Sequence, residues 1–399
     1  MAKILVISPT PSHPQDAGNR ARIFSLYSEL QRWGHTIHFL FLDKAVEKSD
    51  GQAMERQWDS FWCIAWRQPK VPWRKRWFDS LTRILKSNRV LPYKIDDWFD
   101  NSIIPAVQNI SITLNPDIVM VEYAYISKIL SLFDSNILKI LDTHDVFGCR
   151  DQLFYQINKK PIWFYTSETE EKKGVNRADI ILAIQASEAE YFKKLSGKKV
   201  LTVGHLVKSI ELGDAKPTFP PRLLFVGSSN PSNLDGIKWF LENVFEILQE
   251  KIPDIQLDIV GSASDYTQPG KNLNLLGTIE DLTPYYNNAS VVINPLRLGT
   301  GLKIKSLEAL SMKRPLITTP NGASGIEEWA EHAFLCADTA DEFAAAILKV
   351  ITSTELQESL TKGAEEFIND YNKKVFSSLK EEINSFLVKK NAFESTEIF

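Results

Sequence analysis

The sequence predicts an α/β protein made of two doubly wound, Rossmann-like domains that face each other across a cleft. Its 399 residues exceed the size at which a single hydrophobic core usually stops growing. Short, apolar, β-branched runs alternate with helical patterns, as in buried parallel sheets. A polar, proline-bearing stretch near the middle interrupts this alternation, which then restarts.

The first forty residues predict a strand, a loop, a helix and a second strand. Lys3 to Ser8 is a short apolar run, and Thr36 to Leu42 is the next one. Between them, apolar residues recur at three- and four-residue spacing until Gly34, which is well placed to end the helix. Further strands of the first domain are expected at Asp117–Val121, Leu138–Leu141, Asp179–Ile184 and Lys199–Val203.

The second half repeats this organisation after a linker at 208–221. A helix is expected over Asn233–Lys251, and helical segments from Thr354 to about Lys389. Strands are expected at Arg222–Gly227, Gln256–Gly261, Leu273–Leu276, Ser290–Pro295 and Pro315–Thr319. The predicted domains are therefore 1–207 and 222–374, and the last helix, 375–399, is expected to return to the first domain.

Composition excludes several function classes. The net charge of −4 does not favour a dedicated nucleic-acid binder. The three cysteines, Cys63, Cys149 and Cys336, have no metal-ligand or redox spacing, which indicates a reducing compartment. There is neither a cleavable leader nor a membrane-spanning run, so a cytoplasmic protein is expected, with peripheral attachment to the inner face of the cell membrane left open.

The most informative segment follows the strand expected at Ser290–Pro295. Glycines and a threonine precede a helix whose first turn carries two lysines, although the helix dipole disfavours cations there. A bound polyanion such as a diphosphate would explain both features, and Glu308 could accept hydrogen bonds from a ribose diol. The alternative is an ordinary i, i+3 surface pair of Lys305 and Glu308. The predicted donor-binding residues here are Arg297, Gly299, Thr300, Gly301, Lys303, Lys305 and Glu308.

This segment resembles the donor-binding signature of retaining glycosyltransferases with the GT-B fold, the large group 1 or family 4-like family of bacterial polysaccharide and lipopolysaccharide transferases. The similarity lies in Lys303–Leu310, Arg314–Thr319 and Gly322–Ile326, in Phe225–Val226–Gly227, and in the proline loop that leads to Gly18. The resemblance implies a nucleoside-diphosphate sugar bound by the second domain and an acceptor bound by the first. It also implies transfer with retention of anomeric configuration, with no metal and no cofactor.

Two departures from the family pattern concern the phosphate site. Gly227 and Ser228 are further predicted donor-binding residues. Relatives commonly carry an Arg and a Lys after the Phe-Val-Gly strand, whereas here these two residues lead into a loop with no cation before Lys238. Many relatives also carry a glutamate where this chain has Thr300. Arg297, Lys303 and Lys305 are the expected substitutes for the missing cations.

Candidates in the first domain lie at the predicted carboxyl ends of strands. His144 resembles the family histidine near the transferred sugar, and with Asp145 it forms the predicted catalytic pair; a structural role for His144 is the alternative. Gly18 is expected to let its loop approach the donor diphosphate, the alternative being a helix entry capped by Asn19. Arg20 and Glu122 are candidate acceptor-binding residues.

The segment 67–94 holds nine basic residues and one acid. Trp73, Trp77, Leu81, Ile84 and Leu85 fall on one predicted helical face, beside Arg74, Lys75, Arg76, Arg83 and Lys86. Such a helix is typical of contact with an anionic membrane or a lipid-linked acceptor. If it were an ordinary domain helix instead, both tryptophans would be buried in the core.

The predicted function is transfer of a sugar from a nucleotide sugar to a glycan or lipid-linked glycan. A nucleotide-sugar epimerase of the same fold is an alternative, but no carboxylate cluster suited to epimerisation is evident. A catalytically silent binding partner stays open because of the missing cation pair. A dinucleotide oxidoreductase is not favoured, since no G-x-G-x-x-G follows the first strand.

Overall fold

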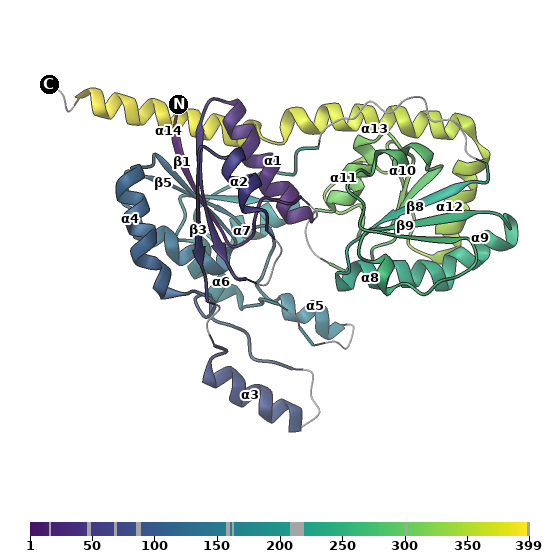
Figure 1. Cartoon of the computed structure of the whole chain (residues 1–399), viewed down its shortest axis with the longest axis horizontal. Helices are drawn as coiled ribbons and strands as arrows, with labels where there is room; N and C mark the ends of the chain where they lie inside the picture. Colours follow the sequence, from purple (N-terminus) through teal and green to yellow (C-terminus); the bar gives the residue numbers. More distant parts are fainter. Residues whose placement is uncertain are drawn as a thin grey trace. The chain divides into compact units, whose positions relative to one another are not determined.

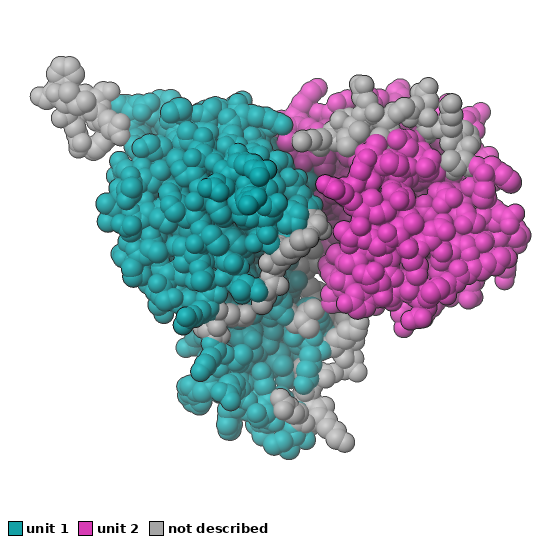
Figure 2. Space-filling view, in the orientation of Figure 1, with its two compact units in different colours: residues 1–205, 376–399 teal, residues 206–375 magenta. Residues whose placement is uncertain are grey.

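A computed structural model describes residues 1–15, 17–45, 49–67, 70–84, 89–156, 160–161, 163–207, 219–299 and 302–396. The chain divides into two compact units (Figure 2). Unit 1 contains residues 1–205 and 376–399, and unit 2 contains residues 206–375. Most of the linker expected at 208–221 lies outside the described residues.

Unit 1 is built on a seven-stranded parallel sheet with the order β3-β2-β1-β4-β5-β6-β7 (Figure 1). Its strands are β1 (Lys3–Ser8), β2 (Thr36–Asp43), β3 (Ser60–Ala65), β4 (Ile118–Glu122), β5 (Leu138–Asp142), β6 (Ile180–Ala183) and β7 (Lys199–Thr202). Its helices are α1 (Gly18–Arg32), α2 (Gly51–Gln57), α3 (Trp73–Ile84), α4 (Ile104–Leu114), α5 (Arg150–Gln156), α6 (Glu168–Val175), α7 (Ala186–Leu195) and α14 (Ser377–Thr396), with 3-10 turns η1 (Asn101–Ile103) and η2 (Ala124–Leu132).

Unit 2 is built on a six-stranded parallel sheet with the order β10-β9-β8-β11-β12-β13. Its strands are β8 (Arg222–Val226), β9 (Gln256–Val260), β10 (Leu273–Gly277), β11 (Val291–Asn294), β12 (Leu316–Thr318) and β13 (Leu335–Cys336). Its helices are α8 (Pro231–Phe240), α9 (Glu246–Lys251), α10 (Thr283–Asn288), α11 (Ile304–Ser311), α12 (Ala340–Thr352) and α13 (Thr354–Lys374), with the π-helical turn η3 (Leu241–Phe245) and 3-10 turns η4 (Ser264–Tyr266) and η5 (Glu327–Trp329). The predicted α/β class with two doubly wound parallel sheets is confirmed.

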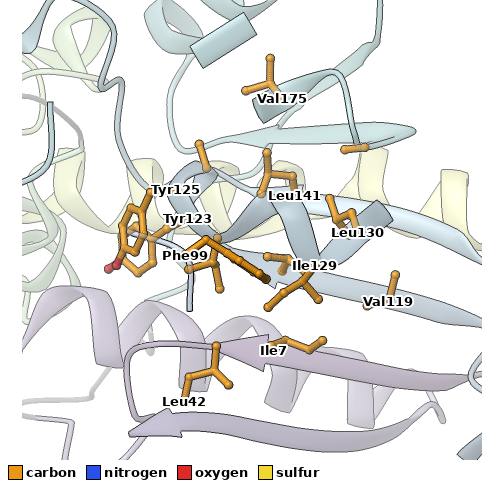
Figure 3. Close-up of a cluster of buried hydrophobic side chains, with 14 of the residues drawn as sticks. Ile7, Leu42, Phe99, Val119, Tyr123, Tyr125, Ile129, Leu130, Leu141 and Val175 are labelled. Atoms are coloured by element: carbon orange, nitrogen blue, oxygen red, sulfur yellow. The ribbon is translucent and has the colours of Figure 1, made fainter. Parts of the chain in front are cut away.

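The core of unit 1 forms where its central strands are covered on both faces. Ile7, Val119 and Leu141 come from β1, β4 and β5, and all three are fully buried. Figure 3 shows them packed with Leu130 of η2 and Val175 of α6 in one hydrophobic cluster. Because strands buried on both faces carry few polar residues, these segments were recognisable as strands from sequence.

In both sheets the strand order reverses at a defined place, although all the paired strands run parallel. In unit 1 the order reverses between β1 and β4, and in unit 2 between β8 and β11. Ligands of open α/β sheets bind outside the carboxyl ends of the strands at such switch points. The loops after β1 and β8 and the residues after β4 and β11 are therefore the places to examine for a site.

Helix α14 belongs to unit 1 although it ends the chain. Lys390 on α14 pairs with Asp117, and Lys199 of β7 pairs with Glu382 on α14. Phe376, just before α14, packs edge-on against Trp33. Among the described helices, none combines the length and the apolarity that crossing a membrane requires.

Candidate functional site

The loop after β8 approaches its neighbours closely. A Cβ at Gly227 would lie 2.6 Å from the ring of Phe225, and a Cβ at Gly261 would lie 2.3 Å from the carbonyl oxygen of Gly227. Asn230 caps helix α8 by accepting hydrogen bonds from the backbone N–H groups of Ser232 and Asn233, at 2.8 and 3.2 Å. The loop thus runs directly from the sheet edge into the positive end of a helix dipole.

Helix α11 begins at the switch point of unit 2 with no acidic residue and no side-chain cap. Lys303 occupies its N-cap position, and its Nζ donates to the carbonyl oxygen of Gly299 at 3.2 Å. Lys305 Nζ donates to Oδ1 of Asn233 on α8 at 2.5 Å, which links the two helix starts. Thr300 and Gly301, which the sequence also assigned to this site, lie outside the described residues.

Lys305 and Glu308 keep some contact with solvent, yet protein atoms surround both closely. Burial lowers the pKa of Lys305 to about 7, with Lys303 acting in the same direction and Glu308 opposing it. Burial raises the pKa of Glu308 to about 7, and Lys305 opposes this rise. Among the described residues the Glu308 carboxylate has no hydrogen-bond partner. Both side chains are only partly exposed, Lys305 bonds Asn233, and no ion pair joins it to Glu308 among the described residues, so the two do not form the surface pair of the alternative.

Arg297 lies at the edge of this cluster rather than within it. Its side chain is 45 % exposed, and its Nη2 lies 3.6 Å from Oδ2 of Asp235 on α8. Its guanidinium also lies over the ring of Trp239, 5.4 Å from the centroid. Arg297 therefore contacts α8 farther along the helix, whereas Lys305 contacts Asn233 in its first turn.

In unit 1, Glu122 and Asp142 end the adjacent strands β4 and β5 and stand in register with each other. Both are fully buried. Tyr27 of α1 donates a hydrogen bond to Oε1 of Glu122, and Nε2 of His144 contacts Oε2. Burial raises the pKa of Glu122, the Asp142 carboxylate raises it further, and His144 lowers it. Glu122 thus positions the His144 ring, and its side chain has no solvent-accessible surface that could contact an acceptor sugar.

Arg22 of α1 neutralises Asp142. Its Nε and Nη2 lie 3.1 and 3.0 Å from the two carboxylate oxygens, and its Nη1 donates to the carbonyl oxygen of Gly204 at 2.5 Å. Both side chains are within 1 % of complete burial. This bidentate pair ties helix α1 to the carboxyl end of β5.

His144 sits in a constrained turn after β5. Its φ is +58°, a left-handed conformation that few non-glycine residues adopt. Its ring stacks on Tyr123 with centroids 4.2 Å apart, and Tyr123 Oη accepts a hydrogen bond from Asn19 at 3.0 Å. The ring is thus held by Glu122 at one nitrogen and by Tyr123 on one face. Strained residues fixed in this way are frequent at functional sites.

The other first-domain candidates have less distinctive surroundings. Asp145 pairs with Arg150 at 3.0 Å. Arg20 is buried, and its Nη1 donates to the carbonyl oxygen of Pro14 at 3.5 Å. Helix α1 begins at Gly18 with Ala17 as its N-cap, so the suggested cap role of Asn19 is wrong. Within the first turn, the Asn19 amide oxygen accepts a hydrogen bond from the backbone N–H of Arg20 at 3.0 Å, and its amide nitrogen donates to Tyr123.

Glu122, Asp142 and His144 also meet the distance criterion for a metal site, since their ligand atoms lie within 4.8 Å of one another. The carboxylate oxygens of the two acids already accept hydrogen bonds, and the Arg22 cation satisfies Asp142. A metal ion would have to displace these contacts. The donor set therefore fits a hydrogen-bonded network better than a cation site.

Several residues of these clusters were not identified from sequence, among them Asn233, Tyr27 and Arg22. Each of these three acts through a partner between 72 and 120 positions away. A buried arginine in an amphipathic helix was the one available signal, because arginine is almost never fully buried unless it is paired.

Unit 2 also has a shallow depression of about 470 Å³ bordered by Glu331, Cys336, Asp338 and Lys349. It includes no residue of the α11 cluster. Its position away from the switch point gives it no role in the site described above.

Comparison with known proteins finds a family match within unit 2 and one curated relative along nearly the whole chain. Residues 220–353 match the family model of the group 1 glycosyl transferases. A curated relative from Klebsiella pneumoniae, an uncharacterised 44.6 kDa protein in the cps region, is 25 % identical over 414 residues, which span 96 % of this chain and 100 % of the relative.

Solved structures show the same fold along nearly the whole chain. Sucrose-phosphate synthase from Thermosynechococcus elongatus matches with a TM-score of 0.68 at 16 % identity, covering 98 % of this chain and all of the other. S. aureus TarM, in a complex with fondaparinux, α-GlcNAc-glycerol and UDP, matches with 0.68 at 12 % identity over 97 % of this chain and 100 % of its own. Anabaena HepE with UDP and glucose matches with 0.61 at 12 % identity over 95 % and 100 %.

Proposed function

We propose that this protein moves a sugar from a nucleoside diphosphate to a glycan or lipid-linked glycan. It is a glycosyltransferase with the GT-B fold, and unit 2 contains its group 1 glycosyl transferase domain. The proposal includes retention of anomeric configuration and independence of metal. The observation that carries it is the helix start of α11, where an acid-free N-terminus, Lys303 and Lys305 lie beside Glu308.

The donor diphosphate would lie against this helix start. Backbone N–H groups and the helix dipole favour an anion there, and the ammonium groups of Lys303 and Lys305 add charge. Glu308, which has no hydrogen-bond partner among the described residues, is available to a ribose diol. Two side chains with pKa values near 7 are costly to keep unless a ligand uses them.

The chemical step needs stabilisation of the departing diphosphate. As the bond from the anomeric carbon to the diphosphate oxygen breaks, negative charge grows on that oxygen, where the lysines and N–H groups can meet it. The acceptor hydroxyl forms the new bond from the same face, and its proton passes to an oxygen of the leaving diphosphate. No other acid or base is required for this balance.

His144 is proposed to act on the transferred sugar. Glu122 holds Nε2, so Nδ1 is the ring nitrogen left for a substrate. Glu122 and Tyr27 are then positioning residues that fix the orientation of the ring. Asp145, paired with Arg150, and Arg20 are weaker candidates for contacts with the acceptor.

The relatives support this choice of substrates. The Klebsiella relative belongs to a cps region, which suits a role in capsular polysaccharide synthesis. TarM and HepE were crystallised with UDP, and HepE also with glucose. UDP is therefore the first nucleotide to test.

The decisive experiment is a thermal-shift screen of the full chain against nucleotide sugars, followed by a donor-hydrolysis assay. A ligand at a hundred times its Kd raises the stability of the fold by about 2.7 kcal/mol, which a melting curve resolves. Lys305→Met should reduce the shift by about half or more at the same ligand concentration, and Lys313→Met, on an exposed pair of the same unit, should preserve it. If no nucleotide sugar shifts the wild type, or if both variants respond alike, the proposed donor site is wrong.

A further inference from the structure

Helix α3 presents its apolar side to solvent. Trp73 is 81 % exposed, Trp77 65 % and Ile84 78 %, and Leu81 and Val71 are also exposed. Trp73, Trp77, Leu81 and Ile84 recur at three- and four-residue spacing, which places them along one face of the helix. The core-helix interpretation predicted buried tryptophans and is therefore wrong. We call these four residues with Val71 the apolar stripe.

The opposite face holds the helix to unit 1 through polar contacts. Lys75 is 2 % exposed, and its Nζ donates to the carbonyl oxygen of Leu91 and to Tyr165 Oη, both at 2.5 Å. It also lies 4.5 Å from the ring centroid of Tyr93. Burial lowers the pKa of Lys75. The sequence placed Lys75 beside the stripe, and the structure corrects this, because its amine finds oxygens and aromatic rings on the inner side.

Arg74 reinforces this attachment. Its Nη2 pairs with Asp97, and its Nη1 donates to the carbonyl oxygen of Pro92 at 3.3 Å. With Lys75 and Arg74 both bonded to the segment that follows the helix, α3 cannot roll its stripe inward without breaking them. The outward orientation of the stripe is thus set by the fold. Figure 1 shows α3 at the lower margin of unit 1, away from the seven-stranded sheet.

The charge around the stripe is mainly positive. Asp79, the sole acid in 67–94, is only part-exposed and its Oδ2 lies 3.6 Å from the buried Lys75 Nζ. Arg76, three residues after Trp73, and Lys70 and Arg67 before the helix are exposed cations. An apolar stripe bordered by cations, in a chain whose net charge is −4, favours an anionic partner with an apolar interior.

We propose that the apolar stripe of α3 docks unit 1 onto an anionic lipid bilayer, with the two tryptophan rings at the headgroup level and Lys70 and Arg76 against the lipid phosphates. Indole rings suit that depth, since they combine apolar area with a polar N–H. The inference goes beyond sugar transfer and rests on the proposed function only for its purpose, access to a lipid-linked acceptor. It accounts for an exposed patch that a soluble monomer would otherwise bury.

The test is flotation of the full chain with phosphatidylcholine vesicles that either contain or lack phosphatidylglycerol. Wild type should float with the anionic vesicles at low salt and detach as salt rises, because screening shortens the reach of its cations. Trp73→Ser with Trp77→Ser should reduce binding at least tenfold. Ile112→Ser, which removes an 81 % exposed side chain from α4, is the matched control and should bind as wild type does.

Charge reversal separates the two contributions. Lys70→Glu with Arg76→Glu should lower binding to anionic vesicles by about fivefold or more for each cation changed. Lys172→Glu with Lys194→Glu makes the same change in net charge at exposed positions on α6 and α7 and should have little effect. Arg74 and Lys75 are left intact because they hold the helix in place.

Three results would overturn the inference. The first is a wild type that does not float with anionic vesicles at low salt, and the second is a tryptophan variant that floats as well as wild type. A wild type that is dimeric by light scattering, and monomeric only in the tryptophan variant, would instead assign the stripe to a second copy of the chain. Donor hydrolysis should be unchanged in the tryptophan variant. Loss of flotation with intact hydrolysis therefore tests membrane docking alone. A wild type that floats but hydrolyses no donor would contradict the proposed function and leave the docking inference standing.

Discussion

Lys305→Met tests whether the cation of α11 exists to bind the donor. The wild-type ammonium lies 2.5 Å from Asn233 Oδ1, and burial lowers its pKa to about 7. A diphosphate placed against it would favour the charged form and raise that pKa again. Methionine keeps the length of the side chain and removes the charge.

The expected proton uptake and the pH dependence of UDP affinity follow from this pKa. At pH 8 a group with a pKa near 7 is roughly one-tenth protonated, so binding of UDP should take up nearly one proton. Affinity should then fall by about tenfold for each pH unit above 7. Loss of a charged hydrogen bond costs about 1.5–3 kcal/mol, so near pH 7 the methionine variant should bind roughly 10- to 150-fold more weakly. Its affinity should also no longer decline with rising pH.

Whereas Lys305→Met should weaken UDP binding, it should stabilise the fold at low pH. Because the pKa of Lys305 is lowered in the fold, the unfolded chain binds more protons between pH 7 and the ordinary value of 10.5. The buried cation therefore destabilises the protein below pH 7, and this cost disappears as pH rises toward 10.5. Lys305→Met should accordingly melt at a higher temperature than wild type at pH 6, and the difference should shrink at high pH.

The assay is calorimetric titration with UDP in two buffers of different ionisation enthalpy, combined with melting curves from pH 6 to 9 and with Lys313→Met as control. Equal UDP affinity in wild type and variant, with no proton uptake in either, would refute a donor role for Lys305. A variant that melts lower at pH 6 and binds normally would show that the lysine is structural.

Three further predictions concern the remaining residues of the two clusters. Glu308→Gln should weaken nucleotide binding by about tenfold through loss of a charged acceptor without lowering the melting temperature, and a lower melting temperature at unchanged affinity would contradict the ribose role. His144→Ala should reduce kcat strongly while UDP affinity, measured by calorimetry, stays near wild type. Glu122→Gln should cause a smaller loss of kcat and a changed pH profile of kcat. If each variant lost affinity and kcat equally, both residues would only support the fold. Arg22→Met should destabilise unit 1 by about 3–5 kcal/mol in denaturant unfolding, because it leaves the buried Asp142 carboxylate without its partner. Arg22→Met combined with Asp142→Asn should recover much of that loss. If the double variant recovered nothing, the pairing would be contradicted.

Local pattern predicted most of the strands because burial on both faces leaves apolar runs. The predicted strand Leu138–Leu141 differs from β5 by one residue, and the predicted Arg222–Gly227 from β8 by one. The edge strands β3 and β13 were missed. Strand β13 has only two residues, and β3 is nowhere fully buried, although Phe61 to Ala65 form an apolar run. The helix expected over Asn233–Lys251 begins instead at Pro231 and contains the π-helical turn at Leu241–Phe245, which no local pattern announced.

The sequence by itself determined the two α/β halves, the family of the second half, and the conflict between lysines and helix dipole at the start of α11. Those features depend on residues that lie close together in the sequence. Tertiary structure alone decided which partners the charged groups meet: Tyr27 and His144 for Glu122, Asn233 for Lys305, and the inward turn of Lys75 that leaves the tryptophans of α3 outside. The physical reason is that burial and pairing, which set the pKa and the exposure of a side chain, depend on residues brought together only by the fold.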